Sequence, residues 1–131
     1  MPRTAVLVYR DGPGTKPPLT EWLETLRKPE RKAYAKCLAY IKLLEQDGCA
    51  LRPPASKYLG EGMDLYELRI RVGSVNYRLL YFFCGKDIAC LSHGLTKEDV
   101  VPDTDIQIAI RRMKLVRLDR NRYTQTWEIP T

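Results

Sequence analysis

Apolar and polar positions follow a helical repeat in the first part of the chain and alternate along strands in the second. Residues 4–9, TAVLVY, are apolar and rich in β-branched side chains, which predicts a first strand. Apolar residues then recur at helical spacing in residues 20–27 and again from Pro29 to Gly48, where they form one stripe opposite a lysine-rich face. Two helices joined by a tight turn are therefore expected after the first strand.

The later part of the chain predicts three strands and a closing helix. Residues 49–64 are rich in proline and glycine, so a loop is expected there. Strands follow at about 65–72, 75–83 and 87–95, because apolar and polar residues alternate in the first and glycine-containing turns separate all three. The middle strand is apolar on both faces, which places it inside the sheet. Pro102 then opens a helix whose first turn carries two aspartates, which suit the helix dipole.

These elements, in the order β-α-α-β-β-β-α, predict an α+β fold. The two-helix hairpin is expected on one face of a small, mainly antiparallel sheet, and the C-terminal helix on the other face together with any functional site. A chain of 131 residues is expected to form a single domain over residues 1–131. Residues 119–131 form a C-terminal extension, in which Tyr123 and Trp127 favour packing of the tail onto the body.

The composition adds a charge imbalance and disfavours several classes of protein. Lysine and arginine number 22 against 16 aspartates and glutamates, which favours a polyanionic partner such as nucleic acid, or an acidic protein. A basic protein without such a partner is the alternative. The four cysteines have no CxxC spacing and there is one histidine, so reduced thiols and neither a metal nor a cofactor are expected. Because no signal peptide or membrane-length apolar stretch is apparent, a cytoplasmic protein without a membrane partner is expected.

Charged residues gather on one face of two adjacent predicted strands. If the strand at 65–72 buries its even-numbered residues under the helices, Glu67, Arg69 and Arg71 project onto the opposite face. Arg78 on the next strand is expected beside them, in a partly apolar setting where an arginine needs an anionic partner. Two interpretations are open. Glu67 is the salt-bridge partner of Arg78, or the surplus of arginines binds a phosphate through the guanidinium forks.

His93 is the single histidine and lies near the end of the last predicted strand. It is either a structural residue with satisfied hydrogen bonds or an acid–base group, because the pKa of histidine suits proton transfer near neutrality. If His93 lies opposite the arginines, together they resemble a ribonuclease site that needs no metal. One group deprotonates the 2′-hydroxyl, arginines stabilise the phosphorane, and an acid protonates the departing 5′-oxygen.

A basic stretch at residues 111–122 holds six positive residues and one acid. Its cations can bind RNA phosphates, or they can simply suit the C-terminal end of a helix. With this stretch and the charged strand face, the candidate RNA-binding residues are Lys57, Arg71, Lys97, Arg111, Arg112 and Lys114.

The run from Leu51 to Lys114 resembles the RelE/ParE toxin superfamily, and within it the HigB-like, phage-derived toxins of type II toxin–antitoxin systems. The resemblance rests on LYELRIR, on YRLLYFF, on a strand that ends in HG with a lysine after it, and on a helix containing AIRRMK. It implies a RelE-like, microbial-RNase-type fold and a ribosome-dependent endonuclease, an mRNA interferase, that inhibits translation. It also implies a cognate antitoxin, commonly a helix-turn-helix protein, beside the ribosome and mRNA as partners.

The resemblance also implies roles for single residues. Glu67 and Arg69 fall where such toxins place basic catalytic residues, and Arg78 matches the arginine that stabilises the phosphate. Lys97 lies near another basic site position. The chain departs from RelE itself at two positions, because Glu67 replaces a lysine and no tyrosine opens the last helix. His93 is therefore the candidate acid. The predicted catalytic residues are Glu67, Arg69, Arg78 and His93. ParE-like members share the fold but poison DNA gyrase, so a non-enzymatic gyrase inhibitor or an inactive toxin-derived nucleic-acid-binding protein is the alternative.

Overall fold

The computed structural model describes residues 3–60, 62–97 and 100–130, with the side chain of Lys97 outside this description. In chain order the elements are β1 (Ala5–Tyr9), α1 (Pro18–Arg27), α2 (Arg31–Asp47), the short 3₁₀ helix η1 (Gly48–Ala50), β2 (Ser56–Tyr58), β3 (Tyr66–Val72), β4 (Val75–Gly85), β5 (Ile88–Lys97), α3 (Asp103–Leu118), α4 (Arg120–Tyr123) and β6 (Thr124–Thr126). No helix among the described residues combines the length and apolarity needed to cross a membrane.

The strands form one mixed sheet in the order β2-β3-β4-β5-β1-β6. β1 runs parallel to β5, and the other neighbouring pairs are antiparallel. β4 lies between β3 and β5, as its apolar faces predict. The predicted α+β fold with a mainly antiparallel sheet is therefore confirmed, and the expected order of elements is present with η1, β2, α4 and β6 added.

Two expectations about local structure are wrong. Residues 49–64 are not entirely loop, because they contain most of η1 and the three-residue strand β2, which pairs with β3. Such a short strand has no periodicity of its own, and only its partner strand defines it. Pro29 does not open the second helix; it lies in the turn, and α2 begins at Arg31.

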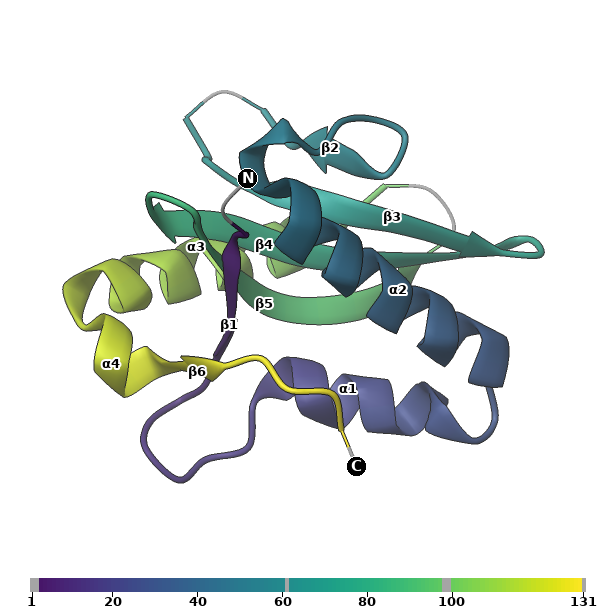
Figure 1. Ribbon diagram of the computed structural model, residues 1–131, viewed down its shortest axis with the longest axis horizontal. Helices are drawn as coiled ribbons and strands as arrows, with labels where there is room; N and C mark the ends of the chain where they lie inside the picture. The colour runs from purple at the N-terminus through teal and green to yellow at the C-terminus, as the bar shows by residue number, and fades with distance from the viewer. Residues whose placement is uncertain (1–2, 61, 98–99, 131) are drawn as a thin grey trace.

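The sheet separates two apolar clusters. α1 and α2 cover one face, over Leu68, Ile70 and Leu79, while α3 covers the other, over Leu80 and Phe82 (Figure 1). The even-numbered residues of β3 therefore face α1 and α2, and its odd-numbered residues face the side of α3, as the alternation predicts. This second face holds the predicted site.

Two close contacts connect the outer elements to the sheet. Gly94 on β5 lies under the ring of Trp22 from α1, and a β-carbon at this position would overlap that ring. At the other end of the chain, Tyr123 stacks on Tyr9 with ring centroids 6.3 Å apart, and Trp127 packs against the cluster under α1 and α2. The tail therefore packs onto the body, as its aromatic residues predict.

Candidate active site

Four residues of the face under α3 lie in one row across neighbouring strands. The strand register pairs Lys57 of β2 with Glu67 of β3, Glu67 with Leu80 of β4, and Leu80 with His93 of β5. Adjacent strands lie about 4.8 Å apart, so the backbones of Glu67 and His93 are separated by roughly 10 Å, with Leu80 between them. Lys57 was predicted from sequence without a partner, and the pairing of β2 places it beside Glu67.

The next two rows bring the arginines together. Arg69 pairs with Arg78 in the second row, and Arg71 pairs with Asn76, which in turn pairs with Lys97, in the third. Arg78 is buried, Arg69 is half-buried and Arg71 is exposed. The positive charge on this face is therefore increasingly accessible toward the β3–β4 turn.

Glu67 lies between two of these arginines. Its Oε2 is 3.6 Å from Nε of Arg78, and its Oε1 is 3.5 Å from Nε of Arg69. The side chains of Glu67 and Arg78 are each 6% exposed, whereas that of Arg69 is 39% exposed. Within the described residues, Glu67 Oε2 and Arg78 Nε have no hydrogen-bond partner. These two facing atoms therefore attract each other by charge, without a hydrogen bond between them.

Burial affects the protonation of both partners. It raises the pKa of Glu67 above its ordinary value, although Arg78, Arg69 and Lys57 act in the opposite direction. Burial likewise lowers the pKa of Arg78, against the effect of Glu67. A carboxylate with a raised pKa is a stronger base than an exposed one, which suits a proton acceptor working near neutral pH.

A pocket of about 430 Å³ opens beside Glu67. One wall is charged and comes from β2 and β3, and the other is apolar and comes from Leu59, the segment before α3 and the first turn of that helix. Its lining residues are Lys57, Leu59, Glu67, Arg69, Val100, Val101 and Ile106. Arg78 is not among these lining residues, so in this conformation it contacts Glu67, and the cations that face the pocket are Lys57 and Arg69.

His93 lies on the same face as Arg78 because β5 contains a bulge. Leu80 pairs with His93 while Tyr81 pairs with Leu91, which leaves Ser92 as an extra residue in the strand. Without this bulge, regular alternation from Cys90 would turn His93 toward α1 and α2. The bulge is therefore what brings the histidine to the side of the arginines.

Both ring nitrogens of His93 are engaged within the protein. Nδ1 is 2.7 Å from the hydroxyl of Ser92, and Nε2 is 3.0 Å from Oδ1 of Asp105 at the start of α3. Burial lowers the pKa of His93, with Arg112 acting in the same direction and Asp105 raising it. The order Ser–His–Asp resembles a hydrolase triad, but Ser92 is fully buried and so has no access to a substrate.

The predicted basic residues of α3 separate into two groups. Arg111 and Lys114 are exposed, whereas Arg112 is half-buried with its guanidinium 4.8 Å from the ring centroid of Tyr9. Arg112 also donates a hydrogen bond of 3.3 Å to the carbonyl of Ser92. The partners Asp105, Ser92 and Tyr9 were missed in the sequence, where Asp105 was explained by the helix dipole alone.

The family of the chain follows from a comparison with known proteins. The model of the family described as "Phage derived protein Gp49-like (DUF891)" matches residues 21–114. The chain belongs to this family. Gp49-like proteins belong to the RelE/HigB-type toxin superfamily, so the chain is a member of a toxin-like, phage-derived family. No curated protein matches the chain.

The part of this Gp49-like protein that matches the family contains all of the predicted site residues, whereas β1, α4 and β6 lie outside it. Across residues 3–60, 62–97 and 100–130, no three histidine, cysteine, aspartate or glutamate side chains lie close enough together to hold a metal ion. The charged residues that line the pocket are one carboxylate, Glu67, and two cations, Lys57 and Arg69.

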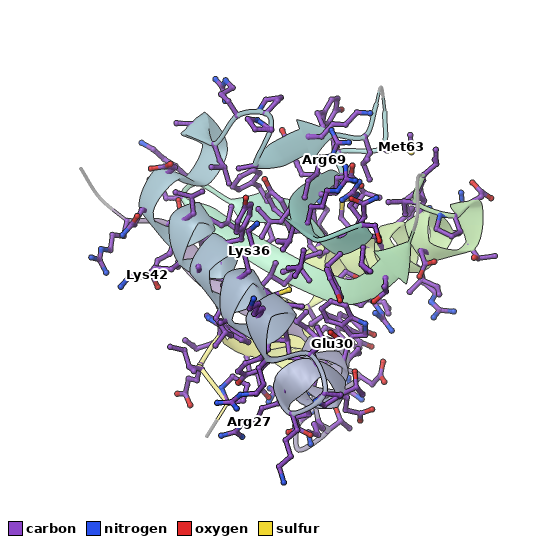
Figure 2. All side chains as sticks on the ribbon, turned by 90° about the vertical axis from the view of Figure 1, so that its right-hand side faces the viewer. Arg27, Glu30, Lys36, Lys42, Met63 and Arg69 are labelled. Atoms are coloured by element: carbon purple, nitrogen blue, oxygen red, sulfur yellow. The ribbon has the colours of Figure 1, made fainter. Side chains whose placement is uncertain are left out.

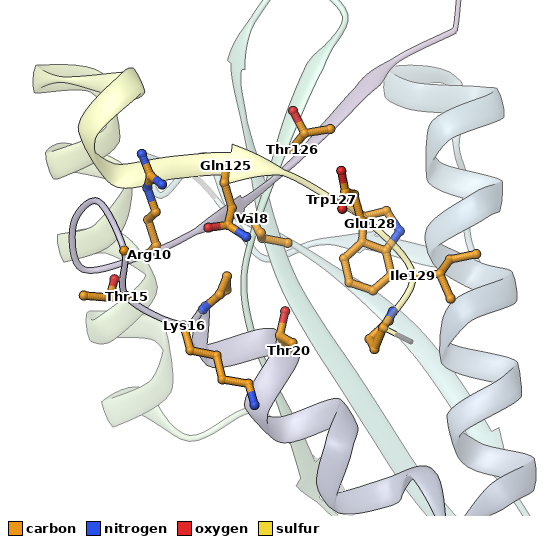
Figure 3. Close-up of a pocket in the computed structure, with 13 residues that line it drawn as sticks. Val8, Arg10, Thr15, Lys16, Thr20, Gln125, Thr126, Trp127, Glu128 and Ile129 are labelled. Carbon is orange, nitrogen blue, oxygen red and sulfur yellow. The ribbon is translucent and has the colours of Figure 1, made fainter.

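A larger pocket, of about 480 Å³, lies between the loop after β1, the start of α1 and the tail after β6 (Figure 3). Its two cations already have partners. Arg10 donates hydrogen bonds to the carbonyls of Asn121 and Arg122, and Lys16 forms an ion pair with Glu24. This pocket contains none of the predicted site residues, so size alone does not identify the site.

Proposed function

We propose that this Gp49-like protein is the toxin of a type II toxin–antitoxin pair and acts as a HigB-like, ribosome-dependent mRNA endonuclease. The observation that carries the proposal is the pocket beside Glu67, where one buried carboxylate lies with the cations Lys57 and Arg69 and is contacted outside the pocket lining by a third, Arg78. A phosphodiester supplies the negative charge that the single carboxylate cannot. Membership of a toxin-like family implies an antitoxin as a partner, and we propose a helix-turn-helix protein in this role.

The proposed reaction needs only side-chain groups. Glu67 takes the proton of the 2′-hydroxyl, and the 2′-oxygen attacks the adjacent phosphorus. Arg69 and Lys57, which face the pocket, stabilise the charge on the phosphorane, while Arg78 holds Glu67 in place. The P–O5′ bond breaks, leaving a 2′,3′-cyclic phosphate on one fragment and a 5′-hydroxyl on the other. His93 is the proposed proton donor to this oxygen, and its Nε2 must part from Asp105 to reach it.

The test is cleavage of mRNA on translating ribosomes by the purified protein, with the fragment ends mapped. We expect cuts within codons, 2′,3′-cyclic phosphate ends, and activity that survives a chelator at concentrations that leave ribosomes intact. Arg69→Ala is expected to slow cleavage by about a hundredfold or more, because it removes a group that stabilises charge in the transition state. The same assay reports on the proton donor: a catalytic His93 makes His93→Gln far more harmful than Asp105→Asn.

Arg3→Ala is the matched control. Arg3 also pairs with a glutamate, Glu45, at 3.3 Å, but lies outside the pocket. The Arg3→Ala variant is expected to cleave mRNA at the wild-type rate. If Arg69→Ala and Arg3→Ala lose the same amount of activity, the assignment of the active site to this pocket is wrong. Intact transcripts together with gyrase-dependent DNA breaks identify the protein instead as a ParE-like gyrase inhibitor.

A further inference from the structure

The outward surface of α2 carries concentrated positive charge. From residue 31 to residue 44 the helix reads RKAYAKCLAYIKLL, with four basic residues and no acidic one. All four basic side chains are exposed, and we call this set the α2 basic face: Arg31, Lys32, Lys36 and Lys42. It lies on the opposite side of the sheet from α3 and its exposed cations (Figure 1).

Helix stability does not account for these charges. The N-terminal end of a helix carries partial positive charge, so basic residues there are unfavourable and acidic ones favourable. α2 begins with Arg31 and Lys32, has no acidic residue in its first turn and has no side-chain cap. Arg31 and Lys32 therefore oppose the helix dipole, with one acidic residue, Glu30, at the N-cap position beside them. The dipole does not account for Lys36 and Lys42 either, because they lie in neither terminal turn. These charges point to a partner that compensates them.

The α2 basic face continues toward the pocket. Lys36 donates a hydrogen bond of 2.7 Å from its ammonium group to the carbonyl of Arg71 on β3. The exposed side chain of Arg71 follows Arg69 by two residues on the same strand, and Arg69 lines the pocket. Figure 2 looks onto this end of the sheet, with Lys36 and Lys42 on α2 and Arg69 on β3. Cations thus line a path from α2 around the edge of β3 to Glu67.

The composition of this face fits RNA better than an acidic protein. Protein interfaces are depleted in lysine and centre on buried aromatic or large apolar residues. Among the described residues, the exposed large apolar side chains lie outside α2, at Tyr58, Val75, Val100, Leu118 and Ile129. The small residues Ala35 and Ala39 are exposed between the cations, which leaves room for a sugar–phosphate backbone.

We propose that the α2 basic face binds the phosphodiester backbone of RNA, forming a second contact surface across the sheet from α3 that leads past Arg71 to the pocket. The identification of the polyanion as RNA rests on the proposed function. Because this surface does no chemistry, it adds to affinity independently of bond cleavage. Its contribution is sensitive to salt and insensitive to base sequence, as expected for contacts to phosphates.

The test measures binding to a fluorescent 2′-O-methyl RNA, which lacks the 2′-hydroxyl and so cannot be cut in the proposed reaction. Anisotropy titrations over a series of KCl concentrations give the slope of log K against log salt. Removing two phosphate contacts with Lys32→Gln/Lys42→Gln is expected to reduce the size of this slope by about 1.4, from about 0.7 for each contact to a single strand.

The control is Lys16→Gln/Lys86→Gln, which removes the same net charge from exposed lysines outside α2. It is expected to keep the wild-type slope, and circular dichroism checks that both variants fold. An unchanged slope in the α2 variant, or the same reduction in both, overturns the proposal. Loss of antitoxin binding with RNA binding intact also overturns it, in favour of an acidic protein. Absence of mRNA cleavage by the wild type overturns only the proposed function, because this assay involves no cleavage.

Discussion

Replacing Glu67 and Arg78 together tests whether their ion pair exists for stability or for function. Glu67→Leu/Arg78→Met removes both buried charges and leaves apolar side chains beside Leu80 and Leu95, their partners in the strand register. A pair that serves only to stabilise the fold should be costly to lose. A pair retained for a reaction can instead lower the free energy of unfolding, as is common at functional sites.

The geometry allows the magnitude to be worked out. At the observed separation of 3.6 Å, the attraction amounts to about 4–5 kcal/mol at an effective dielectric constant of about 20. Removing two charges from water costs several kcal/mol for each ion, and here neither facing atom gains a hydrogen bond. Burial raises the pKa of Glu67 although three nearby cations lower it. The cost of desolvating the carboxylate therefore exceeds its attraction to these cations. We therefore expect the double variant to be more stable than the wild type by about 1–4 kcal/mol.

Urea unfolding at pH 7 measures this difference, and the single variant Arg78→Met provides the contrast. It leaves Glu67 buried with only the half-exposed Arg69 nearby, so we expect it to be less stable than the wild type by about 3 kcal/mol. Because Arg78 lowers the pKa of Glu67, its removal raises that pKa further, and the variant then loses more stability than the wild type as the pH rises, so the deficit should shrink at pH 5. A double variant clearly less stable than the wild type refutes the reasoning and makes Glu67 a structural salt-bridge partner.

Two further predictions concern β5. Burial lowers the pKa of His93, so the folded protein binds fewer protons than the unfolded chain. It therefore loses stability as the pH falls below about 6.5, by at most about 1.4 kcal/mol per pH unit. His93→Gln should flatten this dependence in urea unfolding between pH 7.5 and 5, and the same dependence of stability on pH in the variant and the wild type would contradict the prediction. Gly94→Ala places a β-carbon against the ring of Trp22 and should reduce the free energy of unfolding by about 1–3 kcal/mol. The loss should be smaller when Trp22 is also replaced by leucine, and an equal loss in both backgrounds would exclude the overlap as its cause.

Much of the fold follows from local pattern. The alternation along β3 predicts which residues face α3, the apolar faces of β4 predict its place inside the sheet, and the stripe along α2 predicts its buried side. The turn before β4 is equally local, because Gly73 adopts the positive φ of +61° that glycine tolerates. These features depend only on neighbours along the chain, so Glu67, Arg69 and Arg71 could be assigned to one face from sequence.

The composition of the site depended on contacts between distant segments. β2 has three residues and no periodicity, yet its pairing places Lys57 beside Glu67. Ser92 forms a bulge that no residue pattern marks, and this bulge turns His93 toward Asp105. Sequence leaves two interpretations of Arg78 open, a phosphate ligand or the salt-bridge partner of Glu67, and the fold places its side chain, 6% exposed, against Glu67. Sequence therefore determined which way the residues of the regular strand β3 face, because alternation is local, while tertiary packing decided the facing of His93 after the bulge, which residues meet and which reach solvent.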